Sequence, residues 1–367
     1  MRQLVKIVAV DKIDSHPNAD RLEIARVGGW QMVVPKGQFF DNDKALMFEI
    51  DSFIPESDDR FAFLGKAINW KDKRGYRLRT MRLRKTLSQG LLLPLNDFPE
   101  VVQVYSTRVL NEDGSDPLDL AAVLGIEKWE REMPACLAGQ VKGNFPSFLR
   151  KTDQERIQNM TRKLDDIYSM DFEVTMKLDG SSMTSYIRDE DIGVCSRNLD
   201  LKLDDESSTF VQVFKRDAHE AILKDLKEAF GFNIAMQGEL MGPGIQGNRE
   251  NFPEHRFFVF DLFNIDEGKY IEAEPRHKAI TWIQQKGYNI DHVPVIYCNS
   301  DEKPTFIEIG LPRAGLMEII LMMANGESIN NPVREGIVFK ALDAYKENGH
   351  IFSFKAISNE FLEQGGD

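Results

Sequence analysis

The chain has 367 residues, of which 42% are hydrophobic and 29% charged, and its formal net charge is −13. This length favours two domains, and the composition excludes a disordered chain, collagen and a coiled coil. Every apolar run is shorter than the roughly 18 residues that a membrane-spanning helix needs. The amino terminus carries Lys6 inside its apolar stretch, unlike a signal peptide. Three separated cysteines without a C-x-x-C pattern indicate neither disulfides nor a zinc site, so a reducing, cytoplasmic location is expected.

The charge is unevenly distributed along the chain. Residues 1–110 contain 18 Lys and Arg against 14 Asp and Glu, a net of +4, which leaves 28 against 45, or −17, for residues 111–367. Residues 66–85, the basic strip, hold nine basic residues and one acidic residue, Asp72. A dense basic strip in an acidic protein indicates a site for a polyanion. The alternative is a solvated edge strand whose charges prevent aggregation.

The first 110 residues are predicted to form short strands separated by turns, of which Gly28-Gly29 and Lys36-Gly37 supply two. The expected strands cover residues 4–10, 22–27, 30–34, 44–49, 76–83 and 90–94. Many short strands without a long helix predict a small β-barrel. Within 76–83, the basic residues change parity between Arg79 and Arg82, which predicts a β-bulge in a strand with one cationic face.

A helical segment is expected after the barrel. Ser115 can cap a helix, Pro117 suits its first turn, and apolar residues recur at helical spacing from 118 to 126. A stretch with Gly and Pro at 134–146 marks a boundary. We therefore expect a barrel over residues 1–110, a helical linker over 111–150 and a second domain over 151–367.

The second domain alternates between helices and strands, which predicts an α+β fold. Helices are expected at 152–168, 208–230, 275–286 and 315–325. Strands are expected at 172–177, 182–187, 234–240, 256–264, 336–341 and 351–355. A domain of about 215 residues is within the usual size range.

The sharpest local motif is Lys177-Leu-Asp179-Gly180, at the end of a predicted strand. The lysine places an amine at a strand-to-turn edge, where the glycine lets the backbone approach a phosphate closely. By itself such a lysine is usually a solvated charge. Further segments follow in order: Ser196-Arg197-Asn198, Gly238-Glu239-Leu240, 257–261 (FFVFD), 335–340 (EGIVFK) and 352–355 (FSFK).

In this order, the segments resemble the motifs of the covalent nucleotidyltransferase superfamily, which contains polynucleotide ligases and messenger RNA capping enzymes. A barrel before the catalytic domain, with the phrases 16–22 (HPNADRL) and 88–94 (SQGLLLP), resembles the fifth RNA ligase family, which has an amino-terminal OB domain. The resemblance implies an OB-fold followed by an α+β nucleotidyltransferase domain of antiparallel sheets flanked by helices. Only 12 residues follow Lys355, so the carboxy-terminal OB domain of DNA ligases and capping enzymes is not expected.

The resemblance also implies a role for each motif residue. Lys177 would attack the α-phosphate of ATP, for which its amine must lose its proton. Lys340 and Lys355 would contact the phosphates. Hard oxygen donors for Mg²⁺ or Mn²⁺ are expected at Asp179, Asp261 and Glu335. The expected catalytic residues are Lys177, Asp179, Arg197, Glu239, Asp261, Glu335, Lys340 and Lys355.

The remaining expected contacts concern the nucleoside and the nucleic acid. Glu239 would hydrogen-bond the ribose, and Phe260 and Val338 would enclose the adenine, where a base–aromatic stack contributes roughly 1–3 kcal/mol. Arg197 would bind the nucleic acid near the break. The basic strip is expected to hold the backbone of RNA through Arg77, Arg79, Arg82 and Arg84.

The implied reaction is ATP-dependent RNA ligation, in which a 3′-hydroxyl end is joined to a 5′-phosphate end through a lysyl-AMP and an adenylated 5′ end. Nicks on a complementary strand are the expected substrate, and a monomer is expected. One alternative is a DNA ligase or a capping-type nucleotidyltransferase, against which the missing carboxy-terminal barrel argues. Another is an inactive RNA-binding protein, against which the intact motif residues argue.

Three details depart from a simple match. Ser353 stands where some RNA ligases have a lysine that contacts the triphosphate. Lys340 is expected to make this contact instead. Residues 242–247 spell G-x-G-x-x-G, but they lead into a polar segment with Pro253 rather than an apolar helix, so a dinucleotide-binding fold is rejected. His16 is expected to be a turn residue rather than a catalyst.

Overall fold

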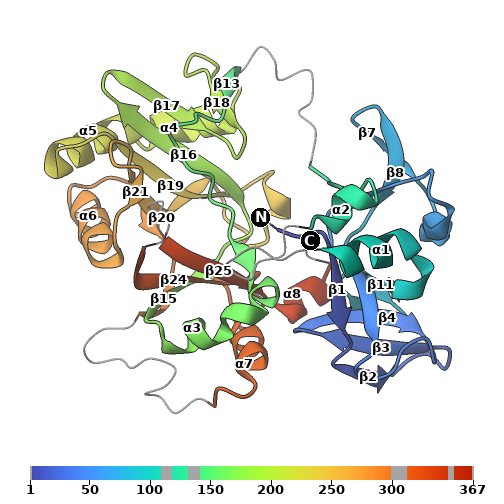
Figure 1. Cartoon of the computed structure of the whole chain (residues 1–367). Coiled ribbons are helices and arrows are strands. Elements are labelled where there is room, and N and C mark those ends of the chain that lie inside the picture. Colours follow the sequence, from blue (N-terminus) through green and yellow to red (C-terminus); the bar gives the residue numbers. More distant parts are fainter. Residues whose placement is uncertain (1, 109–117, 131–140, 299–311, 346–350, 366–367) are drawn as a thin grey trace. The chain divides into compact units, whose positions relative to one another are not determined.

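The computed structural model describes residues 2–108, 118–130, 141–298, 312–345 and 351–365. The chain divides into two compact units, Met1–Met133 with Leu362–Asp367 and Pro134–Phe361 (Figure 1). The first unit therefore extends past residue 110, because part of the stretch expected as a linker packs into it. Leu120 and Ala121 lie in its hydrophobic core, and residues 127–128 pair with one of its strands. The expected cap at Ser115 and Pro117 lies outside the described residues.

The first unit is built from small antiparallel sheets with the orders β1-β5-β11, β2-β3-β4, β12-β6-β8-β7 and β10-β9. Its strands are β1 (Val5–Ala9), β2 (Lys12–Ser15), β3 (Leu22–Val27), β4 (Trp30–Pro35), β5 (Lys44–Phe48), β6 (Ser52–Pro55), β7 (Ile68–Trp70), β8 (Lys73–Arg77), β9 (Met81–Leu83), β10 (Thr86–Ser88), β11 (Leu91–Pro94) and β12 (Glu127–Lys128). Its helices are α1 (Pro99–Thr107) and α2 (Leu120–Val123).

Strand β5 has side chains in two cores because its residues alternate between two faces. Leu46 and Phe48 pack into one hydrophobic cluster, whereas Ala45 and Met47 pack into the other. The single strand expected over residues 76–83 is wrong. The chain leaves β8 and forms β9 in another sheet, so the change of parity between Arg79 and Arg82 marks two strands rather than a bulge.

The second unit contains two sheets (Figure 1). Seven strands of the larger one follow the order β13-β18-β17-β16-β19-β20-β21, with β22 paired to β20, and the smaller one has the order β14-β25-β24-β15-β23. The strands are β13 (Val141–Asn144), β14 (Glu155–Arg156), β15 (Phe172–Lys177), β16 (Ser181–Arg188), β17 (Asp191–Cys195), β18 (Leu199–Leu201), β19 (Ile234–Met241), β20 (Arg256–Asn264), β21 (Lys269–Tyr270), β22 (Asp291–His292), β23 (Val295–Cys298), β24 (Gly336–Tyr345) and β25 (Ile351–Ile357). The helices are α3 (Leu164–Ser169), α4 (Thr209–Arg216), α5 (His219–Phe230), α6 (Ala273–Gln285), α7 (Leu316–Met323) and α8 (Asn359–Glu363), which contains the boundary between the units.

Alternation along the strands gives the smaller sheet one apolar and one polar face. Val174, Phe339 and Phe354 pack against α3 and α7 in one core. Their neighbours in sequence point to the opposite face. The register brings these neighbours together, because Lys177 lies opposite Gly336, Lys340 lies opposite both Glu173 and Ser353, and Lys355 lies opposite Val338.

The larger sheet is built in the same way. Met183, Met236 and Val259 pack with α4, α5 and α6 in one core, and Ser182 lies opposite Glu239 on neighbouring strands. Strand β20 carries a β-bulge, since Gln237 pairs with Asp261 while Gly238 pairs with Val259, which leaves Phe260 as the extra residue.

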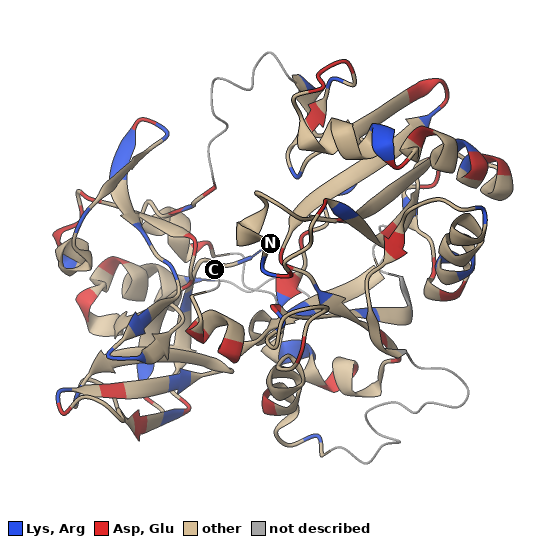
Figure 2. Ribbon diagram, turned by 180° about the vertical axis from the view of Figure 1, so that it is seen from behind, with Lys and Arg blue, Asp and Glu red and all other residues tan. Residues whose placement is uncertain are grey.

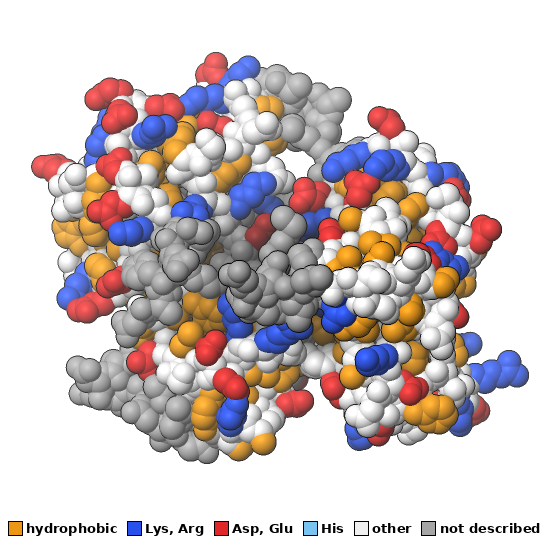
Figure 3. Space-filling model, viewed as in Figure 1, with side chains coloured by type: hydrophobic (Ala, Val, Ile, Leu, Met, Phe, Trp, Pro, Cys, Tyr) orange, Lys and Arg blue, Asp and Glu red, His pale blue; other side chains and the backbone are white. Residues whose placement is uncertain are grey.

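Two expected helices differ from the structure. The helix over 152–168 is wrong, because Glu155 and Arg156 form β14 by parallel pairing with β25, and an α-helix begins only at Leu164. The helix over 208–230 is broken into α4 and α5 at Asp217 and Ala218, where Ala218 has a left-handed φ of 54°. Among the described helices, none combines the length and apolar character needed to cross a membrane. Acidic and basic residues are interspersed along the ribbon of each unit (Figure 2), and both signs are visible on the face in Figure 3.

Candidate active site

Lys177 lies at the end of β15, and its ammonium donates a hydrogen bond to Glu335 at 2.6 Å. The two side chains are 24% and 14% exposed, so the pair is largely shielded from water. Glu335 reaches Lys177 because Lys177 pairs with the next residue, Gly336. A Cβ at Gly336 would lie 2.2 Å from the Ala356 carbonyl oxygen, so glycine permits the close approach of β25.

Two more carboxyl groups face Lys177. Glu239 of β19 accepts a hydrogen bond from the Gly180 amide at 3.1 Å, and a Cβ at Gly180 would lie 2.5 Å from the Leu240 carbonyl oxygen. Burial raises the pKa of Glu239 to about 8. Burial and the Glu335 carboxylate raise the pKa of Asp179 to about 6. The acidic groups thus repel one another and lie in a site where a positive charge would be stabilised.

Lys177 supplies part of that charge. Burial lowers the pKa of Lys177, but the carboxylates of Glu335 and Glu239 outweigh this effect and the net shift is upward. Lys177 is therefore an ammonium ion in this arrangement. A nucleophilic amine must be neutral, so the proton has to leave before a bond to phosphorus can form.

The same carboxyl groups suit a divalent cation. The Oε2 atom of Glu335 is buried and has no hydrogen-bond partner among the described residues. Asp179 adds a second carboxylate, whose pKa is raised by burial and by Glu335 although Arg249 lies 4.0 Å away. Hard oxygen donors of this kind fit Mg²⁺ or Mn²⁺.

Two cationic side chains lie next to each other on the smaller sheet. Lys355 of β25 pairs in register with Arg156 of β14. Burial and the positive charges of Lys177 and Arg156 lower the pKa of Lys355 to about 8. Arg156 is only 9% exposed. Sequence analysis missed Arg156 because it placed this residue in a helix; its pairing with a motif strand is visible only in the fold.

Lys340 and Asp261 form a separate ion pair. The Lys340 ammonium donates to Asp261 Oδ1 and to the Phe260 carbonyl oxygen, each at 2.8 Å. Both side chains are 6% exposed. Arg276 of α6 lies 3.7 Å from the same Asp261 oxygen and donates to Glu173. The expected roles of Asp261 in metal binding and of Lys340 in phosphate binding stay predictions, since both charges are used in this pair.

Glu173, His277 and His292 bring their ligand atoms within 4.8 Å of one another, as a metal site would. However, Arg276 donates to Glu173, and its Nε lies 3.3 Å from His292 Nε2. Burial lowers the pKa of His292 to about 3, so its ring is neutral. The Arg276 guanidinium therefore provides the positive charge that a metal ion would bring to this cluster.

The expected adenine contacts, Phe260 and Val338, lie on β20 and β24. Phe260 belongs to an apolar cluster with Phe258, Met176 and Ile329. Val338 is 8% exposed and lies opposite both Thr175 and Lys355 in the smaller sheet.

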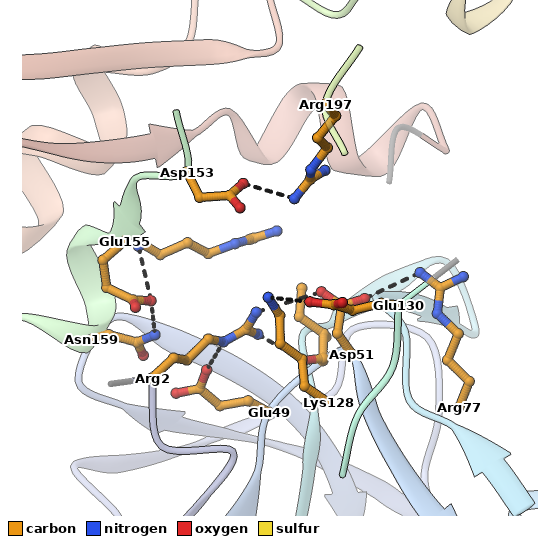
Figure 4. Close-up of polar contacts among 12 residues, drawn as sticks. Arg2, Glu49, Asp51, Arg77, Lys128, Glu130, Asp153, Glu155, Asn159 and Arg197 are labelled. Atoms are coloured by element: carbon orange, nitrogen blue, oxygen red, sulfur yellow. Dashed lines mark hydrogen bonds and ion pairs between the residues drawn. The ribbon is translucent and has the colours of Figure 1, made fainter. Parts of the chain in front are cut away.

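Arg197 lies in the turn between β17 and β18. It donates to Asp153 at 2.7 Å (Figure 4). The two side chains are 62% and 54% exposed. Because exposed ion pairs contribute little stability, Arg197 can exchange this partner for a phosphate at small cost.

The four arginines of the basic strip have different surroundings. Arg77 donates to Asp51 at 3.1 Å (Figure 4), and its guanidinium lies 3.5 Å from the centre of the Trp129 ring. Arg82 donates to the Glu363 carbonyl group, which belongs to the same unit. Arg79 and Arg84 are exposed. The strip is therefore not one uniform cationic face.

Comparisons with known proteins identify the family of the whole chain. A family model described as RNA ligase matches residues 170–357, and one described as an OB-fold domain matches residues 4–95. The search of curated proteins gave no match. RNA ligase of Naegleria gruberi, solved as one variant with AMP and Mn and as another with ATP and Mn, is 38% identical, with a TM-score of 0.78 and 99% of each chain covered. Its structure with pyrophosphate has a TM-score of 0.77 at the same identity and coverage. The expected OB-fold and α+β class are confirmed, and the chain belongs to the RNA ligase family.

Proposed function

We propose that this protein is an ATP-dependent RNA ligase that joins a 3′-hydroxyl end to a 5′-phosphate end, with nicks on a complementary strand as substrate. The observation that carries the proposal is the ion pair between Lys177 and Glu335, at 2.6 Å, within a group that includes Asp179 and Glu239. The same arrangement supports ATP and Mg²⁺ or Mn²⁺ as cofactors. The Naegleria gruberi enzyme, which is solved with ATP and Mn, agrees with this choice.

In the first step, the Lys177 amine attacks the α-phosphate of ATP, an N–P bond forms, and pyrophosphate leaves. Asp179 and Glu335 hold the divalent cation, which would stabilise negative charge on the phosphates when bound. Lys355 and Arg156 stabilise the leaving pyrophosphate, because two adjacent cations suit its charge. Asp261 is a further expected metal ligand, and Lys340 a further expected phosphate contact.

The nucleoside is held by groups of both sheets. Glu239 hydrogen-bonds the ribose, and its raised pKa lets it act as a neutral carboxyl that both donates and accepts. Phe260 and Val338 enclose the adenine.

The second and third steps use RNA. AMP passes from Lys177 to the 5′-phosphate, and the 3′-hydroxyl then attacks that phosphate with loss of AMP. Arg197 holds the nucleic acid near the break, and the basic strip holds its backbone. We propose a monomer acting in the cytoplasm, where the three separated cysteines would stay reduced.

A sealing assay tests this function. A nicked RNA duplex with a 5′-phosphate is incubated with enzyme, Mg²⁺ and either ATP or GTP, and a DNA duplex of the same sequence is used in parallel. We expect ligated RNA with ATP only, and none from Lys177→Ala. The matched control Lys224→Ala removes an exposed lysine of α5 and retains activity. A DNA-only product would favour a DNA ligase, and RNA binding without any ligation would favour an inactive RNA-binding protein.

A further inference from the structure

The basic strip forms two hairpins with different electrostatic surroundings. In the first, β7–β8, three basic residues form ion pairs with carboxylates of the same unit. Lys73 pairs with Glu127, Arg74 with Glu56 at 2.6 Å, and Arg77 with Asp51 at 3.1 Å. These ion pairs explain the basic residues of the first hairpin as structural contacts, without a bound nucleic acid.

The second hairpin, β9–β10, lacks such partners. Residues 79–88 contain four basic residues and no acidic one. Arg79, Arg84 and Lys85 are exposed, and in the described part of the chain no carboxylate forms an ion pair with them. The partner of Arg82 is a neutral carbonyl group. The positive charge of the strip is therefore concentrated on this hairpin.

The hairpin is also held firmly on the barrel, although it forms a sheet of only two strands. His16 Nε2 lies 3.2 Å from the Leu83 carbonyl oxygen, while its Nδ1 accepts from the Asn18 amide at 3.0 Å, so Nε2 carries the proton. Gln31 donates to the Leu87 carbonyl oxygen at 2.8 Å. His16 is thus a turn residue, as expected, that also fixes the position of the hairpin.

The tip of the hairpin retains backbone strain. Leu83 pairs with Thr86, so Arg84 and Lys85 form a two-residue turn, with φ values of 51° and 70°. Left-handed residues at both positions favour Asn-Gly. In this conformation Cβ lies too close to the following carbonyl oxygen, a clash that Gly avoids and that Asn offsets by a local hydrogen bond. The turn of β7–β8 has left-handed residues too, so backbone strain alone does not distinguish the two hairpins.

We propose that the β9–β10 hairpin, with Arg84 and Lys85 at its tip, is the part of the basic strip that binds the phosphate backbone of RNA, whereas β7–β8 is structural. This inference rests on the proposed function for the identity of the nucleic acid. Of the four arginines of the strip that are expected to bind RNA, it assigns this role to those on the β9–β10 hairpin.

The chain offers a matched pair of variants. The turn of β7–β8 also has two residues, Lys71 and Asp72, with φ values of 47° and 58°. Arg84→Asn with Lys85→Gly relieves strain and removes two positive charges. Lys71→Asn with Asp72→Gly relieves the same kind of strain and leaves the net charge unchanged.

The measurements are the melting temperature, the affinity for a nicked RNA duplex at two salt concentrations, and labelling of the protein by ATP. We expect both variants to melt roughly 2–4 °C higher. Only the Arg84/Lys85 variant should bind RNA at least about tenfold more weakly, with a salt dependence less steep by about two units, because each phosphate contact releases counterions. Labelling should be unchanged in both.

Unchanged RNA affinity and salt slope in the Arg84/Lys85 variant would overturn the proposal, and so would an equal loss in both variants. Arg84→Gln with Lys85→Gln, which keeps side chains at the turn, should lose affinity similarly; normal binding by this variant would also overturn it. Absence of ATP labelling in the unmodified protein would instead contradict the ligase function, so the two failures are distinguishable.

Discussion

The ammonium of Lys340 and the carboxylate of Asp261 lie 2.8 Å apart and link the two sheets of the ligase domain. The same ammonium donates to the carbonyl oxygen of Phe260, the extra residue of the β-bulge. A β-bulge redirects a side chain near a site, and here Lys340 fixes the bulge that carries Phe260. The pair therefore acts on the position of the Phe260 ring, which we propose stacks on the adenine.

Lys340→Met should weaken nucleotide binding through Phe260. We expect similar losses of affinity for AMP and for ATP and little change for pyrophosphate. Removing Lys340 also leaves Asp261 with only Arg276, at 3.7 Å, as a cationic neighbour. The free energy of unfolding should therefore fall, by at most roughly 3–5 kcal/mol. Adding Asp261→Asn should restore part of that stability. Calorimetric titration with the three ligands and urea unfolding check both effects; a loss confined to ATP and pyrophosphate would show a direct phosphate contact.

Arg156→Met should affect a different set of ligands from Lys340→Met, namely those that contain the β- and γ-phosphates. Arg156 lies beside Lys355 on the smaller sheet, where two cations match a polyphosphate. We expect affinity for pyrophosphate and ATP to fall about tenfold or more, with AMP little affected. Removing this neighbouring positive charge should also raise the pKa of Lys355 above about 8. Equal losses for AMP and pyrophosphate would instead indicate a general disturbance of β14.

Metal titration distinguishes Glu335 from Asp261, two of the three carboxylates expected to bind a divalent cation. Glu335→Gln removes the group whose Oε2 has no hydrogen-bond partner in the described part of the chain. It should raise the Mn²⁺ concentration needed for half-maximal labelling by ATP. Asp261→Asn should mainly reduce stability, because Asp261 is paired with Lys340. If Asp261→Asn raises the metal requirement as much as Glu335→Gln does, Asp261 also binds metal.

The buried His219 should make the protein sensitive to acid. Its Nδ1 lies 2.7 Å from the Ser185 hydroxyl group, and burial lowers its pKa from 6.5 to about 4. The unfolded chain therefore binds this proton first, so the stabilising contribution is complete above pH 6.5 and is lost as the pH falls toward 4. His219→Gln should reduce the slope of unfolding free energy against pH in this window by up to one proton. An unchanged slope would assign the acid sensitivity to other groups, such as His292.

Sequence patterns predicted the elements that depend on local alternation. Strand β15 begins and ends where expected, and Lys177 lies at its end. The helix predicted around Arg156 was wrong, because this segment forms a strand by parallel pairing with β25, about 200 residues later in the chain. The pairing of Lys340 with Asp261 was equally invisible, since the two residues come from different sheets. The motifs identified carboxyl groups that the fold brings close to Lys177, namely Asp179, Glu239 and Glu335. Which charged group pairs with which became visible only in the fold.

Peptide mapping by mass spectrometry identifies the lysine that carries AMP. The protein is incubated with ATP and Mg²⁺, kept away from acid because a phosphoramidate is acid-labile, and digested. We expect a single AMP adduct on the peptide containing Lys177, which disappears in Lys177→Ala but persists in Lys224→Ala. An AMP adduct on another lysine, or one that persists in Lys177→Ala, would contradict it.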